Sequence, residues 1–142
     1  MTTLTHPLEA SPVALNPSVA ARWGARVSAA IAIVFLAFDA TLKVLQLAPA
    51  LEATAELGYA TTIVPWLGGI QLACLALYVW PRTAPIGAVL WTGYLGGAIA
   101  THARLGAPLL SHTLFPLFVA ALLWLPLYLR DPRVRALVGP AR

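Results

Sequence analysis

Residues 27–47, VSAAIAIVFLAFDATLKVLQL, decide the fold because they form a nearly unbroken apolar run. At about 1.5 Å of rise per residue, a helix of this length spans the roughly 30 Å hydrocarbon core of a bilayer. Asp39 and Lys43 interrupt the run four positions apart, so they lie on one face of a helix. The run therefore predicts a transmembrane helix that carries an ion pair.

The cost of these two charges shows that they need an explanation. Eleven Val, Ile, Leu and Phe residues in the run favour insertion by about 0.3–0.6 kcal/mol each. Each charge near mid-helix opposes insertion by about 2.5–3.5 kcal/mol, so the two sums nearly cancel. We therefore expect Lys43 to extend toward an interface and Asp39 to face protein neighbours or trapped water instead of lipid.

The composition of the whole chain is typical of an integral membrane protein. Of 142 residues, 60% are hydrophobic and 10% are charged, and the mean hydropathy is +0.81, whereas soluble domains carry about 25% charged residues. The single cysteine, Cys74, excludes an internal disulfide, a CxxC redox pair and a cysteine zinc site. The net charge of +4 comes from arginines at the ends of apolar runs. We interpret them as topology signals and lipid contacts, and predict no nucleic-acid partner.

The apolar pattern divides the chain into a tail, four spans and a basic end. Residues 1–20 predict a disordered cytoplasmic tail, residues 21–132 a membrane domain and residues 133–142 a basic cytoplasmic C-terminus. The polar segment 51–57 is too short to span and predicts an interfacial helix between the first two spans. The fold class is therefore an all-α integral membrane four-helix bundle, with spans at about 27–47, 62–80, 85–102 and 111–129.

The arginines also predict the orientation of the spans. Four spans place the N-terminus, the link between the second and third spans, and the C-terminus on one side. That side holds most of the arginines, namely Arg22, Arg26, Arg82, Arg130, Arg133, Arg135 and Arg142. The links on the other side hold only Arg104, together with Glu52 and Glu56. Because positive charge marks the cytoplasmic side, both termini are predicted to be cytoplasmic.

Small residues predict where the helices approach one another. Gly93 and Gly97 form a GxxxG pair on the third span, and Gly68 and Gly69 form a shorter analogue on the second. Such pairs allow close backbone contact between membrane helices. We interpret the Gly93 and Gly97 pair as an internal packing surface, with an oligomer formed through the same residues as the alternative.

Polar residues are predicted to converge in one layer of the bundle, near the outer leaflet. The end of the first span, the end of the third and the start of the fourth meet there. Ionisable groups inside a membrane are by default candidate functional sites. We therefore predict a pocket that is open to the outer leaflet, with the candidate ligand-binding residues Asp39, Lys43, His102, Arg104 and His112. The alternative is a buried structural network that sets the register of the helices.

The charges of this layer favour some ligands over others. A metal site built from Asp39, His102 and His112 is disfavoured, because Lys43 and Arg104 would repel a cation, and no metal is predicted. The same two cations favour an anion, a carboxylate or a quinone-type oxygen. A proton path through Asp39 is a further alternative, but the apolar inner halves of the spans offer little aqueous route.

Several motifs are familiar as a set: FDATLK at 38–43, TGYLGGA at 92–98, SHTLFP at 111–116 and LRDPR at 129–133. Together they resemble the DoxX-like family of small bacterial membrane proteins. The resemblance implies a four-helix bundle in the bacterial cytoplasmic (inner) membrane. It also implies an association with quinone-linked respiratory enzymes, such as thiosulfate:quinone oxidoreductase.

Two functional hypotheses follow. In the first, the polar layer binds a quinone or another small lipid-soluble ligand on behalf of a membrane or periplasmic oxidoreductase partner. In the second, the chain is a non-catalytic accessory or assembly subunit that acts through helix packing. The sequence contains no nucleophile and base motif and no cysteine redox pair, so neither hypothesis gives the chain a self-contained catalytic activity.

Overall fold

The computed structural model describes residues 18–108 and 114–138, and over these residues every regular element is a helix. This confirms the predicted all-α class. The elements in chain order are α1 (Val19–Val44), α2 (Ala48–Glu56), the 3-10 helix η1 (Thr61–Ile63), α3 (Val64–Val79), α4 (Ala84–Arg104), α5 (Phe115–Arg130) and α6 (Pro132–Val138).

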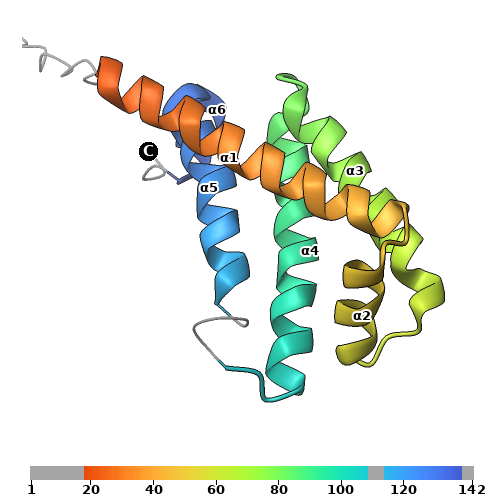
Figure 1. Cartoon of the computed structure of the whole chain (residues 1–142). Helices are drawn as coiled ribbons and strands as arrows, with labels where there is room; N and C mark the ends of the chain where they lie inside the picture. Colours follow the sequence, from red (N-terminus) through yellow and green to blue (C-terminus); the bar gives the residue numbers. More distant parts are fainter. Residues whose placement is uncertain (1–17, 109–113, 139–142) are drawn as a thin grey trace, which may run out of the picture.

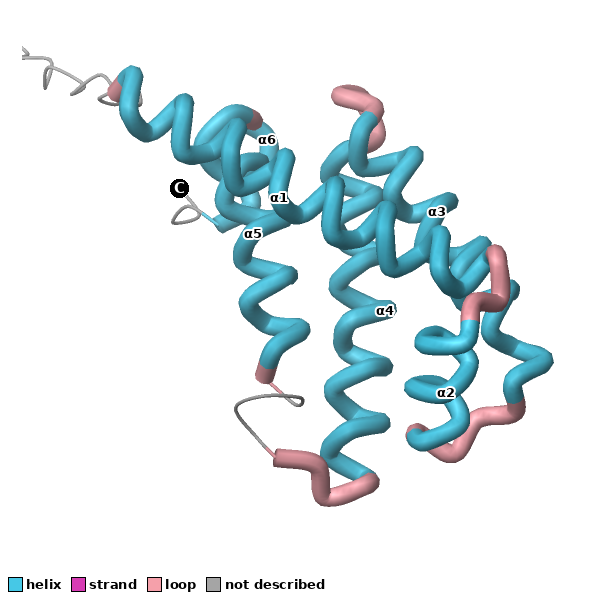
Figure 2. Tube along the Cα trace, in the orientation of Figure 1, coloured by secondary structure: helices cyan, strands magenta, loops and turns pink. Residues whose placement is uncertain are grey.

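The four long helices contact one another in a closed cycle. Helix α1 packs against α3 and α5, and α4 also packs against α3 and α5. Helix α1 runs obliquely across the other three (Figure 1). The start of α1, the turn between α3 and α4, and α6 lie toward one end of the molecule, whereas α2 and the loop that follows α4 lie toward the other (Figures 1 and 2).

The ends of α1 differ from the predicted span because local capping decides them. The helix begins at Val19, where the Ser18 side chain accepts a hydrogen bond from the backbone N–H of Ala21 at 3.2 Å. It ends at Val44, because the chain turns at Gln46 with a φ of 52°. Helix α2 follows at once, three residues earlier than its predicted start.

A last short helix, α6, occupies part of the segment predicted as a basic tail. Pro132 stands at its first position, where its missing N–H removes no hydrogen bond. The Asp131 side chain accepts a hydrogen bond from the backbone N–H of Arg133 at 2.9 Å. The helix therefore begins at a conventional proline and aspartate start signal.

Two of the described helical segments are long and apolar enough to cross a membrane, namely Val19–Val44 and Thr61–Val79. Only 22% and 33% of their most apolar windows are buried, whereas the core helix of a soluble protein would be mostly buried. Large apolar side chains such as Val34, Phe38 and Trp66 lie on the surface. An apolar surface of this extent requires lipid or a protein partner.

The closest helix contacts occur at Gly68 and Gly87. A Cβ at Gly68 would lie 2.8 Å from the backbone nitrogen of Val44 in α1, and a Cβ at Gly87 would lie 2.4 Å from the backbone nitrogen of Tyr78 in α3. By contrast, a Cβ at Gly93 or Gly97 would meet no described atom within 4 Å. The predicted internal packing role of the Gly93 and Gly97 pair is therefore wrong, because neither glycine lies against another described helix of this chain.

Candidate functional site: a pocket beside the ion pair of the first helix

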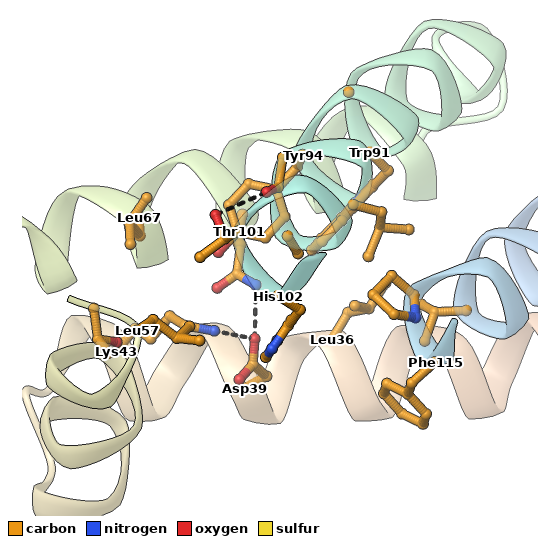
Figure 3. Close-up of a pocket in the computed structure, with 18 of the residues that line it drawn as sticks. Leu36, Asp39, Lys43, Leu57, Leu67, Trp91, Tyr94, Thr101, His102 and Phe115 are labelled. Atoms are coloured by element: carbon orange, nitrogen blue, oxygen red, sulfur yellow. Dashed lines mark hydrogen bonds and ion pairs between the residues drawn. The ribbon is translucent and has the colours of Figure 1, made fainter. Parts of the chain in front are cut away.

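A pocket of about 480 Å³ lies between α1, α3 and α4, and residues of α2 and α5 complete its wall. Asp39 and Leu36 face it from α1, Leu67 from α3, and Trp91 and Tyr94 from α4 (Figure 3). Most of the lining is apolar, and the polar groups include the ion pair that the sequence singled out. The pocket is therefore amphipathic, with a charged group set into a largely apolar wall.

Asp39 is the centre of the polar part of the pocket. Its Oδ2 accepts hydrogen bonds from the ammonium of Lys43, one turn along α1, and from Nε2 of Gln71 in α3 at 2.6 Å. The side chain of Lys43 is 15% exposed and that of Asp39 is 35% exposed. Lys43 thus folds back onto the carboxylate and forms the ion pair that the four-residue spacing predicts, and Asp39 faces protein partners as expected.

A second polar contact closes the pocket beside α2. The hydroxyl groups of Tyr59 and Thr101 lie 2.8 Å apart, and Thr101 also donates to the carbonyl oxygen of Gly97 at 2.9 Å. Because the single hydroxyl hydrogen of Thr101 is used on that carbonyl, Tyr59 is the donor to Thr101. This chain of hydrogen bonds ties the segment between α2 and η1 to α4.

The predicted site residues separate into three groups. Asp39, Lys43 and His102 all line the pocket. Arg104 is exposed and is not among the lining residues; its guanidinium Nη2 donates to the carbonyl oxygen of Leu57, just after α2, at 3.2 Å. His112 lies outside the described residues. Over the described residues, no three His, Cys, Asp or Glu side chains are grouped as metal ligands would be.

Some lining residues were missed by the sequence reasoning. Gly93 and Gly97 border the pocket, so their missing side chains contribute to its volume. A GxxxG pair has the same letters whether it faces a helix or a cavity, so the sequence carried no signal for this role. Trp91 is fully buried and also lines the pocket. An aromatic residue in an apolar span is too common to have marked it.

The rim of the pocket includes an aromatic pair that joins α1 to α5. The rings of Phe35 and Phe115 meet edge to face with their centroids 5.7 Å apart, and both side chains line the pocket while remaining partly exposed. The surface beside them on α5 is also apolar, with Leu117 and Phe118 exposed. This side of the pocket therefore borders the apolar exterior.

Comparison with known proteins agrees with the motifs. The sequence model of the DoxX-like family matches residues 27–125, which extend from within α1 to within α5. No curated protein and no solved structure was found to match the chain. The family match and the two long apolar helices together support a membrane protein. The chain therefore belongs to the DoxX-like family.

Proposed function

We propose that this protein is a multi-pass component of the bacterial cytoplasmic membrane whose pocket binds a small lipid-soluble ligand of the quinone type for an oxidoreductase partner. In this proposal α1, α3, α4 and α5 are the four spans, and both termini are cytoplasmic. The observation that carries the proposal is the amphipathic pocket, in which the Asp39 and Lys43 ion pair is set into an apolar wall. The quinone class is taken from the association with quinone-linked enzymes that the resemblance implies.

The size and polarity of the pocket suit such a ligand. Small-molecule pockets typically measure about 300–1,000 Å³ and combine apolar walls with a few polar groups, and this one measures about 480 Å³. The ammonium of Lys43 has three N–H donors, one of which is used on Asp39. Its remaining donors are available to a ligand oxygen, while Phe35 and Leu36 provide contact for an apolar ring or tail.

Entry from the bilayer is the route that this arrangement favours. The Phe35 and Phe115 pair stands where the pocket reaches the apolar exterior between α1 and α5. An edge-to-face aromatic pair contributes about 0.5–1.5 kcal/mol beyond its buried area. Separation of the two rings is therefore cheap enough to occur thermally, and a lipid-soluble molecule would enter without crossing water.

The test uses two neighbouring glycines of α4. Gly97 lines the pocket and Gly96 is not among its lining residues, and a Cβ at either position would meet no described atom within 4 Å. In the full chain in lipid nanodiscs, a short-tailed benzoquinone should bind saturably above the background of empty nanodiscs. Gly97→Leu should weaken binding about tenfold or more by filling the pocket, whereas Gly96→Leu should leave it unchanged. Absence of saturable binding to the wild type would refute the proposal.

The accessory-subunit function is the second candidate, and one observation favours it. The open face at Gly93 and Gly97 has the small-residue character of a surface on which a partner helix packs. A photo-crosslinking residue at Ala100 in native membranes should then give one reproducible heteromeric adduct, lost in Gly97→Leu and retained in Gly96→Leu. Such an adduct without quinone binding would favour this candidate over the first.

A further inference from the structure

We propose that the pocket selects ligands whose polar head carries a hydroxyl group, such as a phenol or a quinol, over heads that offer only carbonyl or ether oxygens. This inference rests on the proposed function, because it names the chemistry of the ligand of that same pocket. It comes from two buried polar atoms on residues that line the pocket, Oε1 of Gln71 and Nε1 of Trp91. Neither atom has a hydrogen-bond partner among the described residues.

The orientation of the Gln71 amide follows from its contact with Asp39. A carboxylate that is paired with an ammonium has no hydrogen to donate, so it can only accept. The amide group that lies 2.6 Å from Asp39 Oδ2 must therefore be the NH₂ group. The carbonyl oxygen Oε1 is then the free end of the side chain, and it can act only as an acceptor.

The environment of Gln71 makes this free acceptor informative. The residue is 2% exposed and lines the pocket. Buried polar atoms in proteins are nearly always hydrogen-bonded, because an unmatched acceptor loses its water partners and gains none. A donor from a pocket ligand would remove this cost. A molecule that carries only carbonyl or ether oxygens would leave it in place.

Trp91 adds the complementary requirement. The residue is 0% exposed and lines the pocket from α4, opposite the helix that carries Asp39 (Figure 3). Its indole N–H can only donate, so it requires an acceptor. A hydroxyl group donates through its hydrogen and accepts through its oxygen, so a hydroxylated head can meet the requirement of either unpaired atom. A dione or an ether matches Trp91 alone.

The two atoms are covered by neighbouring side chains in this structure, because each has almost no exposed surface. A ligand therefore reaches them only when a neighbouring side chain turns aside. Side-chain rotamer changes of this kind commonly accompany binding, with little movement of the backbone. Tyr94 is a half-buried lining residue that can make such a turn. Its ring meets that of Trp91 edge to face, with the two ring centroids 5.5 Å apart.

The experiment compares two probes that differ at the hydroxyl group, para-hexylphenol and its methyl ether. Binding of each to the full chain in nanodiscs is measured by equilibrium dialysis, with empty nanodiscs as the correction for partition into lipid. The wild type should bind the phenol about tenfold more tightly than the ether. In Gln71→Met the ratio of the two affinities should fall to nearly one. The two probes differ in size in this variant just as they do in the wild type, so the loss of the preference is due to the missing acceptor and not to probe size.

Trp91→Phe is the matched control, because it removes the N–H donor and keeps an aromatic ring. Both probes carry an acceptor oxygen, so this variant should weaken both and leave their ratio near the wild-type value. If Gln71→Met does not fold, the wild-type ratio and Trp91→Phe still test the inference. Equal binding of the two probes to the wild type, or tighter binding of the ether, would overturn the inference and leave the proposed function standing. Binding of neither probe, nor of the benzoquinone, would overturn both.

Discussion

Asp39 joins two helices through one oxygen atom. Its Oδ2 receives the ammonium of Lys43 from its own helix and the amide of Gln71 from α3. These contacts offset the cost of holding a carboxylate away from water. Asp39 and Lys43 are recognisable as a pair in the sequence because they are two charges, four residues apart, within an otherwise apolar run.

Removal of one partner of the Asp39 and Lys43 pair should lower the free energy of unfolding more than removal of both partners. In Lys43→Met the carboxylate of Asp39 loses its counter-ion, and the free energy of unfolding should fall by about 1–3 kcal/mol, toward the lower figure because Asp39 is 35% exposed. The double variant Asp39→Leu, Lys43→Met should recover part of this loss. Thermal unfolding in detergent, followed by circular dichroism, measures all three proteins. A double variant less stable than Lys43→Met would contradict the interpretation.

The pair also has a role in the proposed binding that stability does not measure. Both single and double variants lack the ammonium donor, so benzoquinone binding should be weakened in each, even where the double variant has regained stability. The nanodisc measurement described above gives this comparison directly. Unchanged affinity in Lys43→Met would mean that Lys43 holds the fold and does not contact the ligand.

At the scale of the elements, glycine positions decide how the helices meet. The backbones of α1 and α3 touch at Gly68, and those of α3 and α4 touch at Gly87. The buried face of α1 consists mostly of alanines, among them Ala25, Ala29 and Ala32, so this helix also presents small residues to its neighbours. The sequence indicated that small residues pack helices together. It could not indicate which glycines do so, because that depends on the rotation of each helix about its axis.

Gly68→Ala should therefore destabilise the protein. The new Cβ would lie 2.8 Å from the Val44 backbone nitrogen and 2.9 Å from the Ala40 carbonyl oxygen, and neither atom can move without a shift of α1. Overpacking of this kind costs about 1–3 kcal/mol. Gly69→Ala is the matched control, because a Cβ there meets no described atom within 4 Å. Melting temperatures in detergent should fall for the first variant and not for the second.

At the scale of the whole molecule, basic and acidic residues are distributed unevenly between the two ends. Arg82 lies in the turn between α3 and α4, toward the same end of the molecule as the start of α1 and α6 (Figure 1). Glu52 and Glu56 lie on α2, toward the opposite end. Positive charge marks the cytoplasmic side of a membrane protein. In the proposed function, the end that holds Arg82 is therefore the cytoplasmic one.

Cysteine labelling tests this orientation. In a Cys74→Ala background, which removes the buried native thiol, Glu56→Cys should react with an impermeant maleimide added to intact spheroplasts. Arg82→Cys should react only after the membrane is permeabilised. Both residues are exposed in the structure, so accessibility to the reagent reports the side of the membrane. The reversed pattern would place the pocket toward the cytoplasmic leaflet.

The sequence by itself determined the helical class, the family and the residues Asp39 and Lys43 as an unusual pair. These depend on local composition and on spacing along one helix, which the chain carries in its order of residues. Three features were decided by the tertiary structure alone. Gln71 donates a hydrogen bond to the carboxylate of Asp39, Arg104 donates one to the carbonyl oxygen of Leu57, and Gly97 borders the pocket. Each of these depends on how one helix is rotated and placed against another. That choice is made by the summed packing of all the helices, and no single segment encodes it.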